Sequence, residues 1–342
     1  MEAIRVSTPE PPASPWGCFK DLTVLVTGGA GFIGSCLTER LVESGARVTI
    51  VDHLHARSVA NLARCRDRVE CVQEDILSDR FRTLMASRSF EVIFHLAGNP
   101  YVPPSVEDPW HDFQLNLEGT LRLLESVRKS GSCPRVLIAS SAAVYGDLDV
   151  GPITEEHPTV PISPYGVSKL AAERYGAVYA RLYGMRIASL RFFSVYGPRQ
   201  RKQVVYDLLR KFSSGAAEVE VFGNGTQVRD FNYVSDVVDA TLTVADAGAL
   251  AGEVYNVAGG QECSLRELVG LLSDVLGVRP RIRWSGAVRP GEPQRFLADY
   301  RRLAGLGWRP KIALREGLQR TLSWYRSEDD DAERGAEARR DT

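Results

Sequence analysis

The chain has 342 residues, of which 44% are apolar and 25% are charged, and its 42 Lys and Arg balance 43 Asp and Glu. A formal net charge of −1 disfavours nucleic acid and anionic membranes as partners, because proteins that bind them usually carry a basic excess. The six Cys form no C-x-x-C pair, and no apolar run approaches the ~18 residues of a membrane helix. These features predict a cytoplasmic protein with no membrane span and no cysteine-based metal or redox framework.

Strand-like and helical segments alternate between two polar ends of the chain. Residues 1–20 are rich in Pro and predict a flexible arm, and residues 327–342 predict a charged, solvated tail. A helix is expected at Phe32–Glu43, after the first of several apolar runs. The expected strands are Leu22–Thr27, Arg47–Val51, Val69–Gln73, Glu91–His95 and Pro134–Ala139.

Continuous Val, Ile and Leu runs between polar turns are typical of strands that helices cover on both faces. This alternation predicts an α/β fold with a Rossmann-like, doubly wound parallel sheet over residues 21–197. After residue 197 the strands become short, which predicts a smaller mixed α/β substrate-binding domain over residues 198–326, with some chain crossing between the two lobes.

A glycine-rich turn follows the first expected strand. Gly28, Gly31 and Gly34 permit a tight turn, close backbone approach to a pyrophosphate and close packing of the helix. The N–H groups at the start of that helix, including those of Phe32 and Ile33, suit an anion. Asp52 ends the second strand 24 residues after Gly28, where a carboxylate binds ribose hydroxyls and repels a 2′-phosphate. The pattern predicts NAD rather than NADP.

Further cofactor contacts are expected where other strands end. Asp75 and Ile76 follow the third strand. The Asp75 carboxylate is in a position to accept a hydrogen bond from the adenine amino group. The remaining expected cofactor contacts follow the fourth strand or lie near the active site: Leu96, Ala97, Gly98, Asn116, Ser140, Tyr165, Lys169 and Phe192.

A Tyr and a Lys lie four residues apart near the start of an expected helix, Tyr165–Tyr183. This spacing places the Tyr165 phenol and the Lys169 ammonium on one helical face. A phenol that acts as a base near neutrality needs its anion stabilised by about 4 kcal/mol, which a neighbouring cation and a positive nicotinamide ring can supply. Ser141 adds a hydroxyl at the end of the fifth strand, at the sheet edge where ligands bind in such folds.

In combination, these motifs resemble the extended short-chain dehydrogenase/reductase family, within its nucleotide-sugar epimerase and dehydratase branch. The resemblance runs from about Leu22 to Tyr325. It implies that Ser141, Tyr165 and Lys169 are catalytic and that Asn116 supports the active-site helix. It also implies that the Tyr takes a proton from a sugar hydroxyl while NAD⁺ accepts a hydride.

The residues after Ser141 favour one branch of this chemistry. Dehydratases of the family carry acidic residues there, whereas this chain has Ala142 and Ala143, which transfer no proton. The extra Cys or His of 3,5-epimerases is also missing from this segment. The remaining reaction is inversion at C4 of a UDP-sugar, with a nucleotide-sugar dehydratase as the alternative.

The resemblance extends to the sugar site. UDP-glucuronate 4-epimerases commonly have Thr at the position of Ser194, followed by the same Gly-Pro-Arg-Gln-Arg run that ends at Arg201. An Arg grips a carboxylate bidentately, so UDP-glucuronate is the expected substrate. This chain differs from those enzymes at two places. They have hydroxyl residues at the positions of Ala142 and Ala143, and they have an Arg in the loop that ends here at Ser105. UDP-glucose and UDP-N-acetylglucosamine therefore stay as alternatives.

The expected substrate contacts lie in both halves of the chain. Phe222 is expected to flank the uracil, and Arg229 and Arg289 to face the diphosphate, with Glu292 at the uridine ribose. The complete expected set is Ser105, Ser141, Ala142, Ala143, Tyr165, Ser194, Arg201, Val221, Phe222, Arg229, Arg289 and Glu292.

Three further expectations concern partners. His53 and His55 have no accompanying ligand residues, so no metal site is predicted. The resemblance implies a homodimer that associates through a four-helix interface. A nucleotide-sensing regulator on the same fold is the non-enzymatic alternative, which the complete Ser141, Tyr165 and Lys169 set disfavours.

Overall fold

A seven-stranded parallel sheet forms the centre of the molecule, in a computed structural model that describes residues 16–148, 151–287, 291 and 293–338. The strand order is β3-β2-β1-β4-β5-β6-β10, and every neighbouring pair is parallel. The strands are β1 (Thr23–Thr27), β2 (Arg47–Asp52), β3 (Val69–Gln73), β4 (Val92–His95), β5 (Arg135–Ser141), β6 (Arg186–Phe192) and β10 (Ala251–Val257).

The order of the strands reverses between β1 and β4, where the chain leaves one half of the sheet and begins the other. In open α/β sheets, ligands bind outside the carboxyl ends of the strands at such a point. The predicted Rossmann-like sheet is confirmed, and its carboxyl edge beside β1 and β4 is the place to look for a cofactor site.

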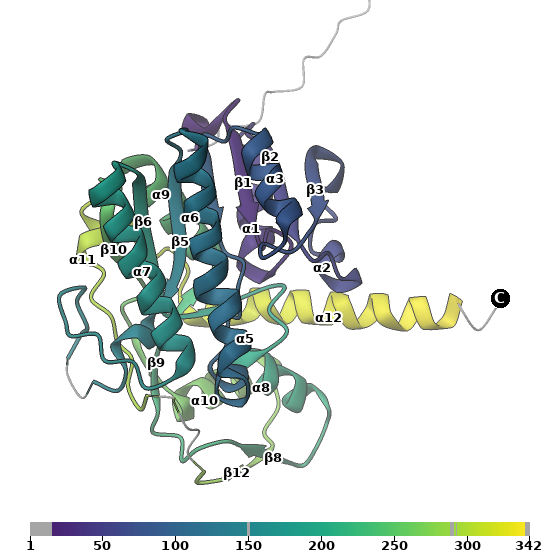
Figure 1. Cartoon of the computed structure of the whole chain (residues 1–342). Coiled ribbons are helices and arrows are strands. Elements are labelled where there is room, and N and C mark those ends of the chain that lie inside the picture. The colour runs from purple at the N-terminus through teal and green to yellow at the C-terminus, as the bar shows by residue number, and fades with distance from the viewer. Residues whose placement is uncertain (1–15, 149–150, 288–290, 292, 339–342) are drawn as a thin grey trace, which may run out of the picture.

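Helices cover both faces of the sheet (Figure 1). On one face lie α3 (Asp79–Ser87), α6 (Gly119–Ser130) and α7 (Pro164–Tyr183), and on the other lie α1 (Phe32–Glu43) and α9 (Val234–Ala247). Short helical segments connect these layers: η1 (Gly17–Phe19), α2 (Ala56–Ala60), η2 (Arg66–Arg68), α4 (Val102–Glu107), α5 (Pro109–Phe113), the π-helix η3 (Gln114–Glu118) and the 3-10 helix η4 (Ala142–Tyr145).

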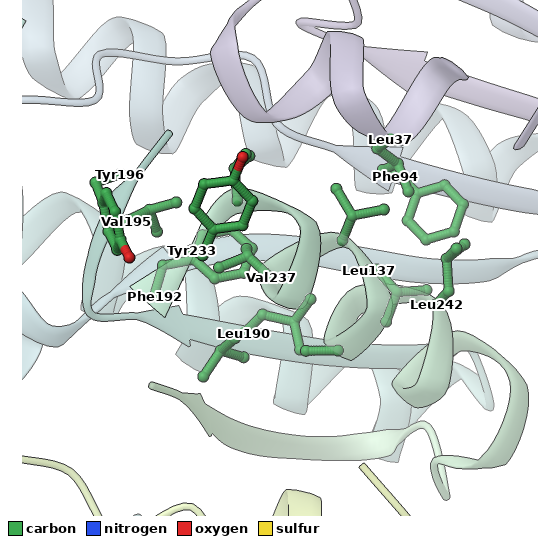
Figure 2. Packing of buried hydrophobic residues seen from close by; sticks show 14 of the residues in the cluster. Leu37, Phe94, Leu137, Leu190, Phe192, Val195, Tyr196, Tyr233, Val237 and Leu242 are labelled. Atoms are coloured by element: carbon green, nitrogen blue, oxygen red, sulfur yellow. The ribbon is translucent and has the colours of Figure 1, made fainter. Parts of the chain in front are cut away.

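The two faces of the sheet bury separate apolar clusters. Leu37 of α1 and Leu242 of α9 pack with Phe94 and Leu137 of the sheet, and Figure 2 shows this cluster continuing to Tyr196 and Tyr233. On the opposite face, a second cluster places Leu123 of α6 among residues of the sheet and α3. Burial on both faces explains why the central strands, such as β1 and β4, consist of continuous apolar runs rather than alternating patterns.

The second half of the chain contributes to both lobes. The strand β10 belongs to the main sheet and the helix α9 packs against it, so chain beyond residue 197 also contributes to the larger lobe. The smaller sheets are β7 (Ser194–Tyr196) with β9 (Val228–Tyr233) and β11 (Glu262–Ser264), and β8 (Glu218–Val221) with β12 (Arg281–Trp284). Their helices are α8 (Gln203–Ser213), α10 (Leu265–Leu276), α11 (Arg301–Ala304) and α12 (Leu314–Ala338). Because β7 begins two residues after β6 ends, this lobe starts at the carboxyl edge of the main sheet.

Both ends of the chain differ from the sequence prediction. Residues 1–15 lie outside the described residues, but Phe19 is buried completely, where its ring packs beside Phe94. The flexible arm therefore does not extend to residue 20. At the other end, α12 continues to Ala338 through the predicted tail and extends away from the body (Figure 1). Among the described residues, no helix combines the length and apolar character that a bilayer span needs.

Candidate active site

Three candidate catalytic residues meet at the carboxyl end of β5. Ser141 ends β5, while Tyr165 and Lys169 lie in the first turns of α7 and are each 8% exposed. The Lys169 ammonium donates to the carbonyl of Ala139 over 3.1 Å and lies 5.9 Å from the centre of the Tyr165 ring. The Ser141 hydroxyl accepts from the backbone N–H of Ala143 over 3.2 Å. The structure therefore brings together the three side chains that the sequence singled out.

The start of α7 explains how Tyr165 is positioned. Ser163 caps the helix by accepting from the N–H of Gly166, and Pro164 occupies the first helical turn, where its missing N–H costs nothing. The hydroxyl of Ser105, on α4, accepts from the N–H of Tyr165 over 3.1 Å. Two side chains thus fix the backbone from which the phenol projects.

Ser105 does not match the predicted substrate contact. Its side chain is buried completely, and its hydroxyl donates to the carbonyl of Val102 over 2.6 Å while it accepts from Tyr165. Both hydrogen-bonding directions are in use, so Ser105 supports the active-site helix.

Burial opposes charge on both functional groups of α7. Burial raises the pKa of Tyr165 to about 12, which a hydrogen bond with Ser141 opposes and the charge of Asp112 reinforces. Burial lowers the pKa of Lys169 to about 8, and the negative charges of Asp112 and Glu173 oppose that change. The protein alone therefore keeps the phenol protonated near neutrality. A positively charged ligand beside Tyr165 is needed to produce the phenolate.

The glycine-rich turn between β1 and α1 has the shape that a dinucleotide pyrophosphate requires. Gly28 has a φ of +69°, and a methyl group on Gly34 would lie 2.0 Å from the Gly28 carbonyl oxygen. Gly31 is the N-cap of α1, so the first N–H groups of this helix, from Phe32 onward, have no acceptor within it. Backbone amides and the positive helix end thus face the turn.

Asp52 closes the other side of this turn. Its carboxylate accepts from the N–H of Ala30 over 3.1 Å and from the N–H of Leu54 over 3.0 Å. These bonds fix the carboxylate at the carboxyl end of β2, beside the glycine-rich turn. Asp75 lies after the adjacent strand β3 and accepts from the N–H of Leu77, while Ile76 is buried.

Asn116 reaches the loop after β4 from the π-helix η3. Its amide nitrogen donates to Asp112 over 2.8 Å, whereas its amide oxygen is buried without a hydrogen-bond partner among the described residues. A methyl group on Gly98, which has a φ of +148°, would lie 2.4 Å from that oxygen and 3.6 Å from the Lys169 nitrogen. The loop Leu96–Gly98 therefore passes directly beside Asn116 and Lys169. The unsatisfied oxygen of Asn116 and the glycine-rich turn between β1 and α1 together fit NAD, which is an extended, polar ligand.

A hydrogen-bond chain under this loop holds His95 neutral. Thr120 donates to the carbonyl of Asn116 over 2.7 Å and therefore accepts from His95 Nε2, 3.0 Å away. Thr27 lies 2.8 Å from His95 Nδ1 and supplies the proton on that side. Burial lowers the pKa of His95 to about 3, and the charge of Lys169 acts in the same direction.

Two of the predicted cofactor contacts have other partners. The hydroxyl of Ser140 donates to Glu173 inside α7, and Glu173 forms a buried ion pair with Arg191 at 2.7 Å. Phe192 ends β6 and is only 9% exposed within the apolar cluster of Figure 2. Both residues lie behind the site and support its walls.

The predicted uridine and sugar contacts occupy the smaller lobe. Ser194 begins β7, Val221 ends β8, and Phe222 follows it with a partly exposed ring. Arg229, in β9, donates to the carbonyls of Val228 and Gln294. Arg289 and Glu292 lie outside the described residues. The roles given to these side chains stay predictions.

Arg201 has different partners from those predicted. Its guanidinium donates to the Asn61 side chain over 3.0 Å, pairs with Glu328 of α12 and stacks over the ring of Trp324. Asn61 in turn donates to the carbonyl of Ala30 in the glycine-rich turn over 3.0 Å. Arg201 therefore joins α12 to the cofactor turn through two of its five N–H groups.

Sequence reasoning missed the buried carboxylate of Asp112. Asp112 lies four residues before Asn116, a spacing that places both on one helical face. That spacing was the available signal. Asn61 carried no comparable signal, because the contact with Arg201 joins positions 140 residues apart.

The fold and the glycine-rich turn define an enzyme class that binds a dinucleotide cofactor. The sequence profile of the NAD dependent epimerase/dehydratase family matches residues 24–258, and the chain belongs to this family, an extended short-chain dehydrogenase/reductase group.

Relatives of different activities cover nearly the whole chain. It is 36% identical to a UDP-glucose 4-epimerase of Mycolicibacterium smegmatis over 90% of this chain and 99% of that protein. It is 33% identical to a dTDP-glucose 4,6-dehydratase of an Actinoplanes species over 90% and 98% of the two chains. A UDP-glucuronic acid 4-epimerase from Bacillus cereus, solved with UDP-glucuronic acid and NAD, superimposes with a TM-score of 0.83 at 30% identity, over 90% of this chain and 99% of that one. The comparisons therefore place the chain among NAD-dependent UDP-sugar 4-epimerases and their relatives.

Proposed function

We propose that the protein inverts C4 of a UDP-sugar through a 4-keto intermediate, with NAD bound along the carboxyl edge of the sheet. The observation that carries this proposal is the set of Ser141, Tyr165 and Lys169 around one buried point, next to Ala142 and Ala143. These two alanines are 3% and 8% exposed and offer no acid or base. A site with one proton-transferring phenol suits oxidation and re-reduction at a single carbinol.

The side chains divide the proton chemistry between them. The Tyr165 phenolate removes the proton of the C4 hydroxyl, and the Ser141 hydroxyl hydrogen-bonds the same oxygen. Lys169 keeps a positive charge beside the phenol and binds the nicotinamide ribose. Bound NAD would supply the hydride acceptor for C4 and, once the 4-ketose has rotated, the hydride donor to its opposite face. Tyr165 then returns its proton to the new C4 hydroxyl.

A dehydratase needs more than this set provides. Removal of water from the sugar requires a further acid and a further base near the adjacent carbons. The segment after Ser141 places Ala142 and Ala143 where such groups lie in the dehydratases that the chain resembles. This difference supports epimerisation over the reaction named for the Actinoplanes relative.

For the sugar, the sequence favours UDP-glucuronate, because Ser194 and Arg201 match the uronate pattern. The Bacillus cereus epimerase, solved with UDP-glucuronic acid, supports the same substrate. The contacts of Arg201 with Asn61 and Glu328 favour a second candidate, an uncharged UDP-hexose such as UDP-glucose. The relative named a UDP-glucose 4-epimerase agrees with that candidate.

One pair of assays separates the two substrates. The purified protein is given UDP-glucuronate, UDP-glucose or UDP-N-acetylglucosamine, and kcat/KM is measured for each. If Arg201 binds a carboxylate, Arg201→Ala lowers kcat/KM for UDP-glucuronate at least about tenfold more than for UDP-glucose. Arg210→Ala, on the exposed surface of α8, is the matched control. An equal loss on both substrates shows that Arg201 binds no sugar carboxylate and assigns it to the cofactor turn.

We also propose that the protein is a homodimer that associates through α5 and α7. An apolar stripe follows α7 through Val167, Tyr175, Val178 and Leu182, of which Leu182 is 66% exposed. Trp110 of the adjacent α5 is 67% exposed. Monomeric proteins rarely expose such continuous apolar surface, and a two-fold axis would pair this stripe with its own copy.

A further inference from the structure

The carboxylate of Asp112 is buried completely on α5 and is held from one side only. Its Oδ1 accepts from the amide of Asn116 and from the amide of Asn99, each over 2.8 Å. Asn99 also donates to the carbonyl of Tyr101, so it is itself fixed in the loop after β4. Three segments that surround the active site therefore aim the Asp112 carboxylate.

The second oxygen of Asp112 has no hydrogen-bond partner among the described residues. The side-chain oxygen of Asn116 is in the same condition. Unsatisfied buried acceptors are costly, since each has lost its hydration without replacement. Lys169 lies near the Asn116 oxygen, because a methyl group on Gly98 would lie 2.4 Å from that oxygen and 3.6 Å from the Lys169 nitrogen. The Lys169 ammonium has three donors, of which Ala139 takes one.

The electrostatic influence of Asp112 reaches both functional residues of α7. Its charge opposes the loss of the Lys169 proton and opposes ionisation of Tyr165, so it raises the pKa of each group. Glu173 also acts on Lys169, but it is paired with Arg191 at 2.7 Å. His95 beside Lys169 is neutral. Tyr101, the other titratable group that acts on Tyr165, lies under the ammonium of Lys202.

Among the described residues, Asp112 forms no ion pair within 4 Å of a Lys, Arg or His nitrogen. A buried carboxylate in that condition is unfavourable unless a cation nearby compensates it. The neighbouring cation is Lys169, whose own burial disfavours its charge. The charge of Asp112 therefore makes the charge of Lys169 less costly.

We propose that Asp112 is a positioning residue of the reaction: its buried carboxylate, aimed by Asn99 and Asn116, is the counter-ion that keeps Lys169 charged beside Tyr165. The expected effect on kcat rests on the proposed function. The effect of the Asp112 charge on Lys169 and Tyr165 does not, because it concerns the protein alone.

The test compares Asp112→Asn with the wild type, because Asn has the same shape and still accepts from both amides. Removal of the charge lowers the pKa of Lys169 and of Tyr165, so both limbs of the pH profile of kcat move to lower pH by about one unit. Loss of packing alone lowers kcat and leaves both limbs in place. Glu107→Gln, which removes an exposed negative charge from the neighbouring α4, leaves the profile unchanged.

A second measurement needs no turnover. The ultraviolet absorbance of tyrosinate is titrated in the wild type and in Asp112→Asn, each with Tyr165→Phe subtracted, so that only Tyr165 contributes. We expect Tyr165 to ionise at lower pH in Asp112→Asn; an unchanged titration overturns the proposal even if the protein epimerises no UDP-sugar. Asp112→Ser is a smaller uncharged variant that keeps the comparison decisive if Asp112→Asn does not fold.

Discussion

The hydroxyl of Ser105 accepts a hydrogen bond from the backbone N–H of Tyr165 over 3.1 Å, although the two residues are 60 positions apart. This bond anchors the first turn of α7 to α4. The backbone that carries the phenol of Tyr165 is therefore held by a fully buried residue, whose hydroxyl also donates to the carbonyl of Val102.

Ser105→Ala is expected to lower the free energy of unfolding by about 1–3 kcal/mol, because the N–H of Tyr165 loses a buried acceptor. The same variant lowers kcat and leaves KM close to the wild-type value, since Ser105 positions Tyr165 and does not contact substrate. Urea denaturation and steady-state kinetics measure the two effects. Ser58→Ala, on the surface of α2, is the control, and a rise in KM without a fall in kcat would restore Ser105 as a substrate contact.

Tyr165→Phe is expected to lower kcat by about 10²–10⁴-fold, the range for loss of a general acid–base group. Folding is unaffected, because the ring stays and only the hydroxyl is removed. Tyr179→Phe, further along α7, removes a hydroxyl that donates to Glu125 over 2.7 Å and leaves kcat unchanged. Equal activity of both variants would contradict the assignment of Tyr165 as the base.

Gly34→Ala is expected to abolish tight NAD binding. The new methyl group would lie 2.0 Å from the carbonyl oxygen of Gly28, so the turn must open. Gly270→Ala, in α10, is the matched control, since a methyl group there meets no atom within 4 Å. Isothermal titration with NAD compares the two variants, and similar affinities would show that the turn does not hold the pyrophosphate.

The free energy of unfolding is expected to decrease as the pH is lowered, because His95 is buried in its neutral form. Its pKa is about 3 in the folded protein and about 6.5 in the unfolded chain, so the unfolded state binds the additional proton as the pH falls below 6.5. The contribution of His95 is fully present above pH 6.5 and declines by about 1.4 kcal/mol per pH unit below it. The free energy of unfolding is measured by urea denaturation at several pH values. We expect His95→Gln to lack this pH dependence and the exposed His111→Gln to keep it. Parallel slopes in all three proteins would exclude His95 as the source.

The dimer is expected to dissociate when charge enters the apolar stripe of α7. Val178→Asp with Leu182→Asp buries two carboxylates in the proposed interface, so light scattering after gel filtration reports a monomer. Arg210→Asp, on α8, stays dimeric. If the wild-type protein is itself a monomer, the proposed homodimer is wrong.

The sequence predicted the sheet and the glycine-rich turn well, because local patterns determine both. The bounds of α1 and β3 agree with the predicted ranges, and α7 begins one residue before the predicted helix. The strands β1, β2, β4 and β5 were recognisable because burial on both faces requires continuous apolar runs.

The remaining features depend on contacts between distant segments, which periodicity does not encode. The π-helix that aims Asn116 has the composition of an ordinary helix, and its wider turn is only visible once Asp112 and Thr120 have their partners. Arg201 carries a motif typical of a carboxylate site, yet Asn61 and Glu328 engage it. Helix α12 continues through a segment whose charge predicted a solvated tail.

The central claim is that one hydride leaves C4 and returns to the same carbon, and proton NMR in D₂O without added NAD tests it most directly. The purified protein is given UDP-glucuronate and UDP-glucose in separate samples. The account predicts a new anomeric signal of the C4 epimer from one of them, with no deuterium in the sugar, because the hydrogen does not exchange with solvent. Deuterium entering the sugar with loss of water would mean a dehydratase and contradict the account.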